Sequence, residues 1–147
     1  MRTAALGAST RSSRSPQARS VSICAREDLE ELFRRIALSL MINNTDDHLR
    51  NHGLLRSGSG WRLSPVFDIN PNPEASAIRS TSVFSEYDRE PALAALLSNA
   101  HEFELTHGEA EAIVADVAGA VGMCESFAVR TGIGKAERET ILRALHN

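Results

Sequence analysis

The sequence has few cysteines, few aromatic residues and no excess of basic charge, and each scarcity excludes a class of protein. Its two cysteines, Cys24 and Cys124, are far apart and belong to no CxxC pair, so we expect reduced thiols rather than a disulfide framework or a zinc site. A net charge of -3 argues against nucleic-acid binding, which depends on clustered Lys and Arg. Because no apolar run approaches the roughly 20 residues that span a bilayer, we expect a cytoplasmic protein that does not enter membranes.

The chain has the length of one domain and a compositionally biased N-terminus. Its 147 residues suffice to bury a core, and 5% aromatic content indicates a core built mainly from Leu, Ile, Val and Ala. Residues 1–26 contain five Arg and six Ser, with no acidic residue before Glu27. A disordered tail, an organellar transit peptide and a misassigned start codon would all produce this composition. We predict a disordered Arg/Ser-rich tail over 1–26 and one folded domain over 27–147.

Hydrophobic periodicity predicts a mainly α-helical domain with a small β-hairpin. Apolar residues at three- and four-residue spacing predict a helix over 28–42, which Asn43 can end because Asn tolerates the left-handed conformation. Residues 54–56 and 61–63 flank a Ser-Gly-Ser-Gly turn and predict a hairpin. The glycines of this turn match no phosphate-binding fingerprint, so they indicate only a turn.

The second half of the chain predicts further helices after an irregular segment that ends near Arg89. Pro91 suits the first turn of a helix through Leu97. The capping-box pattern of residues 106–109 opens a longer helix, which Gly132 ends, and a last helix covers 135–145. Along one face of the longer helix lie the apolar residues Ile113, Val114, Val117, Val121, Cys124, Phe127 and Ala128.

Three polar residues, Asp46, Asn51 and Asp68, form the candidate site. Asp46 and Asn51 belong to a loop after the first helix, and Asp68 follows the hairpin, which returns the chain close to Asn51. Magnesium prefers oxygen ligands and takes one or two from the protein, while a second carboxylate can accept the proton of an attacking hydroxyl. This set suits phosphoryl transfer, whose catalysis is mostly positioning and charge neutralisation.

Two motifs around these residues match a known kinase pattern. Residues 44–51 read N-T-D-D-H-L-R-N and residues 63–71 read L-S-P-V-F-D-I-N-P. The D-x-x-x-x-N spacing and the later Asp are those of protein kinases. The His-Arg that precedes the first Asp in eukaryotic kinases is Asn-Thr here, so the chain is not of that type. It closely resembles the HipA-like serine/threonine kinases of bacterial toxin-antitoxin systems, over roughly residues 28–147.

The resemblance implies a fold and roles for individual residues. The fold would be the helical C-terminal lobe of a HipA-like kinase. Asp46 would be the catalytic base, and Asn51 and Asp68 would bind Mg²⁺ with ATP as co-substrate. Asp47, His48 and Arg50 would support the loop, with Arg50 standing where the family usually has Lys. The implied partners are a helix-turn-helix antitoxin, a protein substrate and a complementary N-terminal lobe.

Several interpretations of the whole chain stay open. The sequence shows no glycine-rich phosphate loop, and its first lysine is Lys135, so no residue suits the ATP-binding lysine of a kinase. We therefore expect a truncated, split or degraded relative, which is either a lobe awaiting its other half or a non-catalytic interaction module. A lobe alone would expose apolar surface, so we expect self-association. His48 and His52 have the spacing of zinc ligands on a helix, but the Glu of a zinc hydrolase motif is missing.

Overall fold

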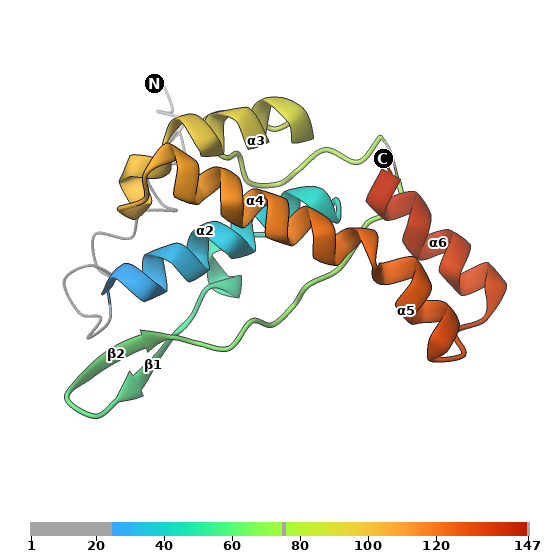
Figure 1. Ribbon diagram of the computed structural model, residues 1–147, viewed down its shortest axis with the longest axis horizontal. Coiled ribbons are helices and arrows are strands. Elements are labelled where there is room, and N and C mark those ends of the chain that lie inside the picture. The colour runs from blue at the N-terminus through green and yellow to red at the C-terminus, as the bar shows by residue number, and fades with distance from the viewer. Residues whose placement is uncertain (1–24, 75, 147) are drawn as a thin grey trace, which may run out of the picture.

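The structure is a computed structural model that describes residues 25–74 and 76–146, so Cys24 and residues 1–24 of the tail predicted over 1–26 lie outside the described residues. The described part is mainly helical with one antiparallel hairpin, which confirms the predicted fold class (Figure 1). In chain order the elements are α2 (Ala25–Met41), η2 (Leu49–Asn51), β1 (Leu54–Ser57), β2 (Gly60–Leu63), α3 (Arg89–Ser98), η3 (Ala100–Phe103), α4 (His107–Gly122), α5 (Cys124–Arg130) and α6 (Lys135–His146).

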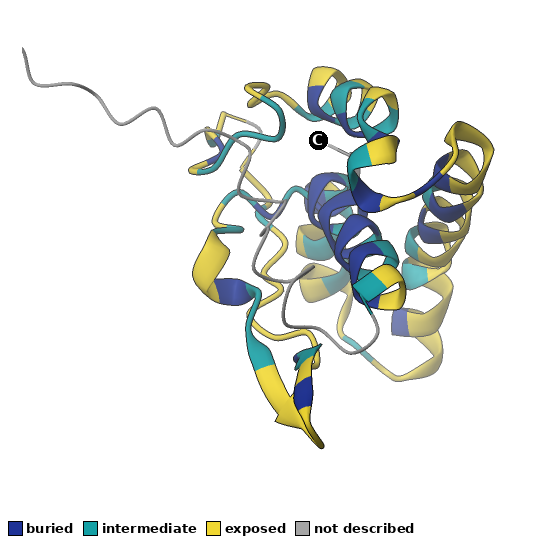
Figure 2. Cartoon of the chain, turned by 90° about the vertical axis from the view of Figure 1, so that its left-hand side faces the viewer, coloured by how far each residue is buried: buried dark blue, intermediate teal, exposed yellow. Residues whose placement is uncertain are grey.

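Helix α2 is the centre of the fold, and α3, η3, α4 and β2 all pack against it. It begins at Ala25, three residues before the predicted start, so Ala25 and Arg26 belong to the helix rather than to the predicted tail. Its buried stripe includes Leu29, Phe33 and Leu40, at the spacing that keeps apolar side chains on one helical face. Figure 2 shows buried residues concentrated on α2 and on the sides of the neighbouring helices that face it.

The core contains few aromatic residues, and two of them meet at its centre. The rings of Phe33 and Phe103 pack edge to face, with centroids 5.3 Å apart and planes at 80°. Phe84, from the irregular segment, makes a second such contact with Phe103 at 6.4 Å. Most other buried residues are Leu, Ile and Ala, as the composition predicted. These contacts fasten both α2 and the irregular segment to η3.

At the end of α2, an asparagine occupies the left-handed position that glycine usually takes after a helix. Asn43 has φ 54°, in the left-handed region, as predicted. The amide of Asn44 donates to the Ser39 carbonyl at 2.9 Å, and the amide of Asn43 donates to the Leu40 carbonyl at 3.2 Å. This pair of bonds is the Schellman arrangement, which satisfies the last carbonyls of a helix. The chain therefore leaves α2 in a fixed direction, directly into the first motif.

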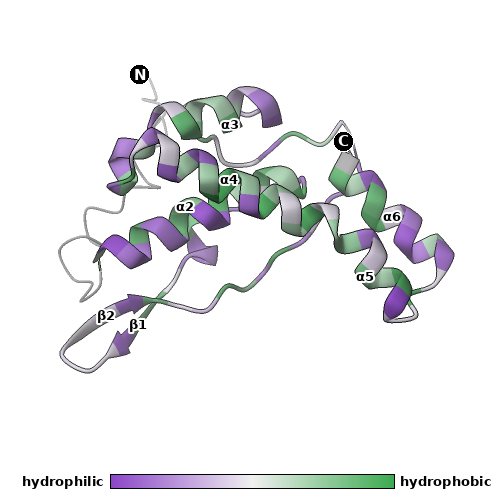
Figure 3. Cartoon of the chain, viewed as in Figure 1, coloured by the Kyte–Doolittle hydropathy of each residue, from purple (hydrophilic) through white to green (hydrophobic). Residues whose placement is uncertain are grey.

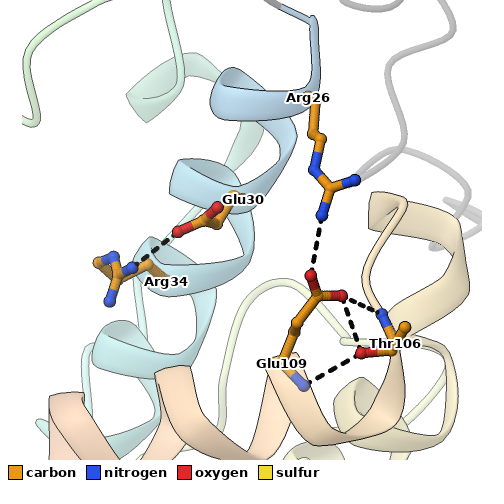
Figure 4. Close-up of polar contacts among 5 residues, drawn as sticks. All are labelled: Arg26, Glu30, Arg34, Thr106 and Glu109. Atoms are coloured by element: carbon orange, nitrogen blue, oxygen red, sulfur yellow. Dashed lines mark hydrogen bonds and ion pairs between the residues drawn. The ribbon is translucent and has the colours of Figure 1, made fainter.

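The predicted capping box at the start of α4 is present (Figure 4). The amide of Glu109 donates to the Thr106 hydroxyl at 3.2 Å, and the amide of Thr106 donates to Glu109 Oε2 at 2.7 Å. Arg26 adds an ion pair with Glu109 at 2.8 Å. The hydrogen bonds from Thr106 and the charge of Arg26 hold the pKa of Glu109 below its usual value. The start of α4 is thus tied to the start of α2.

The prediction of one continuous helix from Thr106 to Gly132 is wrong, because the helix breaks at Met123. Helix α4 ends at Gly122, and after Met123 the chain turns into α5, which packs against α6 (Figure 1). A glycine at this point weakens the helix because Gly loses more conformational freedom than other residues. The bend leaves Phe127 59% exposed rather than inside the core.

Contrary to the expectation from the sequence, the segment His107–Arg130 is long and apolar enough to pass as a membrane span, with a mean hydropathy of 1.6 over an 18-residue window. Figure 3 shows this hydrophobic character along α4. Core helices of soluble proteins pass the same test, although only 17% of this window is buried. Ile113 and Val117 pack into the core, while the face of α4 opposite α2 is exposed.

The hairpin is present where it was predicted, and it places the second motif. Its strands pair from Leu54 with Leu63 to Ser57 with Gly60. Gly58 in the turn has φ 56°, a conformation that favours glycine, whereas Gly60, predicted as part of the turn, begins β2. An ion pair of 3.1 Å joins Arg62 to Asp28. The hairpin is therefore anchored to α2, and it brings the chain back to the first motif.

Candidate functional site

The first motif forms a tight loop between α2 and β1. Asn51 is buried in η2, and its Nδ2 donates to the carbonyl oxygen of Asp46 at 3.4 Å. The Asp46 residue itself is exposed. The loop thus fixes the backbone of Asp46 through a buried amide while its carboxylate stays accessible to solvent. A carboxylate in this position can accept a proton from a bound hydroxyl.

Hydrogen bonds join the first motif and the residue before it to the loop that follows the second motif. Asn43 Nδ2 donates to the Asn72 carbonyl at 2.8 Å, and the Asn72 amide donates back to the Asn43 carbonyl at 3.1 Å. Asn72 Nδ2 also donates to Thr45 Oγ1 at 2.9 Å, and the Ser80 amide donates to the Thr45 carbonyl at 2.8 Å. The loop after the second motif is therefore fastened to the first motif, and we call these contacts among Asn43, Thr45, Asn72 and Ser80 the motif clamp.

The base of the hairpin brings Asp68 close to Asn51 of the first motif. The Ser64 amide donates to the Gly53 carbonyl at 2.8 Å, where the hairpin closes. A Cβ on Gly53 would lie 3.3 Å from Ser64 Oγ, so a side chain there would crowd this closure. Asp68 has φ 58°, an uncommon conformation for a residue other than glycine, and its Oδ1 accepts from Asn70 Nδ2 at 2.7 Å.

Asn51 and Asp68 line one small cavity, as the sequence predicted for two residues on adjoining loops. The cavity has a volume of about 10 Å³, on the scale of a single water molecule. Its other polar lining residues are Arg35, Ser39, Asn44, Asp47 and His52. A carboxylate and an amide oxygen are ligand types that Mg²⁺ takes from proteins, but a space of this size holds one water, so the other waters that Mg²⁺ keeps would lie outside it. A nucleotide does not fit inside it.

Asp47 is held by residues that the sequence analysis did not assign to it. His52 Nε2 lies 2.8 Å from Asp47 Oδ1 and hydrogen-bonds to it. Burial opposes ionisation of the Asp47 carboxyl, but the hydrogen bond and charge of His52, the nearby Ser39 hydroxyl and the charge of Arg79 outweigh it, so the pKa of Asp47 lies below its usual value. Asp47 therefore stays ionised and braces the loop from the inside.

Arg79 and His52 are the clearest residues that sequence reasoning missed at this site. Arg79 is buried, and its guanidinium donates to the Ser39 carbonyl at 3.2 Å and to Ser39 Oγ at 3.4 Å. Burial lowers the pKa of Arg79, while Asp47 opposes that shift. Nothing in the pattern of an irregular segment marks one arginine as buried. The position of His52 next to Asn51 in the sequence could have indicated a role at this site, but the sequence analysis considered His52 only as a zinc ligand.

The remaining predicted site residues lie around the loop. His48 precedes η2 and is half-buried, with no hydrogen-bond partner for its buried Nδ1 in the described part of the chain. Arg50 is exposed. Among residues 25–74 and 76–146, no group of three or more His, Cys, Asp or Glu residues could hold a metal ion, and His52 is bonded to Asp47. The geometry therefore gives no support to a zinc site at His48 and His52.

A comparison with protein families identifies the chain. The model of the HipA-like C-terminal domain matches residues 10–124, which is most of the sequence. The chain belongs to this family. The match spans both motifs, the motif clamp and the helices α2, α3 and α4 of this HipA-like domain. Comparisons with curated proteins and with solved structures found no match.

Proposed function

We propose that this HipA-like domain is the catalytic lobe of a protein serine/threonine kinase, which transfers the γ-phosphoryl group of ATP to a protein hydroxyl when an N-terminal lobe is supplied. The observation that carries the proposal is the motif clamp. It joins the loop of Asp46 and Asn51 to the segment that follows Asp68. Asn51 and Asp68 line one cavity, while Asp46 does not line it and is tied to Asn51 through its backbone carbonyl.

Each of the three residues has a role that its environment supports. Asn51 and Asp68 would hold Mg²⁺, which neutralises the phosphates of ATP when it is bound. Asp46 would accept the proton of the protein hydroxyl, because its carboxylate is exposed while Asn51 fixes its backbone. Asp47, paired with His52, would keep the loop in shape without touching the reacting atoms.

The size of the cavity and the surface beside it support the need for a second lobe. A space of about 10 Å³ accommodates a metal ion or a water but no adenine ring. Next to it, Val66, Phe67 and Ile69 are exposed at 47%, 46% and 37%. Apolar surface of this kind is usually covered by a ligand or a partner. The proposed occupants are the nucleotide and a complementary N-terminal lobe in the cytoplasm.

A non-catalytic interaction module is the second candidate, and the same exposed segment favours it. Val66, Phe67 and Ile69 could be covered by a protein alone, for example a helix-turn-helix antitoxin or a kinase-like partner. In that case the polar residues of the two motifs would serve only to shape the surface. The two candidates differ in whether the chain handles a nucleotide.

Calorimetric titration with ATP, in the presence and absence of Mg²⁺, separates these candidates. The kinase proposal predicts Mg²⁺-dependent binding that is lost in Asp68→Asn. Asp116→Asn is the matched control, because Asp116 is an exposed carboxylate on α4, away from the motifs, and it should bind as the wild type does. Binding that survives in Asp68→Asn would contradict the assigned site. Silence of both proteins would mean that the chain is a lobe awaiting its other half, an interaction module or a remnant, and the missing half would be sought next.

A further inference from the structure

Arg35 brings a buried positive charge to the cavity, and no role has been assigned to it. It lies on the inner part of α2, with 9% of its side chain exposed. Its Nε donates to Glu31 Oε1 at 2.7 Å, but its Nη1 is buried and has no hydrogen-bond partner among the described residues. Buried polar groups are nearly always hydrogen-bonded, so an unpartnered cationic donor at a candidate site requires an explanation.

Several other polar side chains that line the cavity are bonded to one another or to nearby groups, although the buried Nδ1 of His52 has no partner among the described residues. Asp47 accepts from His52, and Asn51 Nδ2 donates to the carbonyl of Asp46. Ser39 accepts from Arg79. Asp68 accepts from Asn70 through one oxygen, Oδ1, and a carboxylate can accept several hydrogen bonds. Of the two carboxylates that line the cavity, Asp47 is bonded to another lining residue, His52, whereas the hydrogen bond of Asp68 goes to Asn70, which does not line it. Asp68 is therefore the carboxylate that can turn toward Arg35.

We propose that Arg35 is a positioning residue for Asp68, with its Nη1 drawing the carboxylate into the cavity, directly or through one water, so that Asp68 faces Asn51. This inference rests on the proposed function, in which Asn51 and Asp68 hold the metal ion. The two opposite charges line the same small space, where they attract each other. Without Arg35, the exposed Asp68 keeps only its local bond to Asn70.

The sign of the effect on metal binding distinguishes positioning from simple charge repulsion. A carboxylate that ligates a metal is usually hydrogen-bonded in turn, and loss of that support typically weakens metal binding about tenfold or more. A nearby cation that acted only through its charge would repel the metal, so its removal would tighten binding. Positioning therefore predicts weaker binding after Arg35 is replaced, and repulsion predicts stronger binding.

The test is a titration with Mn²⁺, followed by electron paramagnetic resonance, on the full chain. Arg35→Met should weaken Mn²⁺ binding at least tenfold, and Arg35→Lys should restore part of it. Arg34→Met is the matched control, because Arg34 is the neighbouring arginine on α2, ion-paired with Glu30 at 3.0 Å (Figure 4), and it should bind Mn²⁺ as the wild type does. Unchanged or tighter binding in Arg35→Met would overturn the proposal. If Arg35→Met does not fold, Arg35→Lys is tested instead, because its affinity for Mn²⁺ is still expected to be lower than that of the wild type.

A second measurement needs no metal and separates this inference from the proposed function. Urea unfolding of the wild type, Arg35→Lys, Asp68→Asn and the double variant gives the coupling between the two residues. Coupling is expected, so that Asp68→Asn changes the unfolding midpoint less when Arg35 is already replaced. Additive midpoints would overturn the positioning role. If the wild type does not bind Mn²⁺, the proposed metal site fails, while this cycle still decides whether Arg35 and Asp68 interact.

Discussion

Replacement of Asn43 tests whether the motif clamp is held by a hydrogen bond, by a backbone conformation, or by both. Asn43 ends α2 with φ 54° and donates its side-chain amide to the Asn72 carbonyl at 2.8 Å. Asn43→Ala removes the bond and forces an alanine into the left-handed conformation. Asn43→Gly removes the same bond but accepts that conformation without strain. The two variants therefore differ mainly in backbone strain.

The magnitudes follow from these two contributions. A left-handed conformation costs an ordinary residue about 1–2 kcal/mol. A partly buried hydrogen bond contributes about 0.5–1.5 kcal/mol. We expect Asn43→Ala to lower the free energy of unfolding by about 2–3 kcal/mol, and Asn43→Gly by about 1 kcal/mol. The first loss is large against a total stability of about 5–15 kcal/mol.

Urea unfolding followed by circular dichroism measures both free energies. Asn99 provides the matched control, because it also ends a helix and donates Nδ2 to the Ala95 carbonyl at 2.8 Å, but its φ is -106°. At Asn99, alanine should be tolerated at least as well as glycine. Equal losses for Asn43→Ala and Asn43→Gly would refute the argument from backbone conformation. Losses below about 0.5 kcal/mol in both would refute the hydrogen bond as well.

Three further predictions concern the core, the loop and the exposed helix. Phe33→Ala should lower the free energy of unfolding by about 3–5 kcal/mol, because it leaves a cavity beside Phe103, and a loss under about 1 kcal/mol in urea unfolding would contradict this packing. Because the pKa of Asp47 is lowered from 3.8, its ionised form contributes stability above about pH 4 that is lost as the pH falls through the lowered pKa. Acid unfolding of Asp47→Asn should lack this part of the pH dependence, and an unchanged acid profile would contradict it. Phe127→Ser should reduce self-association in analytical ultracentrifugation, because Phe127 is an exposed aromatic residue near the exposed Met123, and a wild type that stays monomeric at all concentrations would refute the expectation.

The sequence predicted most of the fold because its signals are local. The periodic apolar residues of α2, the turn at Gly58 and the capping box at Thr106 each act within a few residues, and all three are present in the structure. The prediction failed where a continuing apolar stripe outweighed a local signal against helix. The stripe past Gly122 favoured one helix, whereas the structure breaks it at Met123, directly after that glycine, and α5 packs against α6.

The candidate site was likewise predicted in part from the sequence and decided in part by the tertiary structure. Two motifs in the right order, with a hairpin between them, were enough to predict that Asn51 and Asp68 would meet and that the chain would resemble its family. The tertiary structure alone decided that His52 pairs with Asp47, that Arg79 is buried against Ser39, and that Arg35, whose buried Nη1 has no partner among the described residues, lines the cavity. Those contacts depend on how α2 packs against distant segments, and the burial of an arginine side chain leaves no trace in the pattern of its neighbours along the chain.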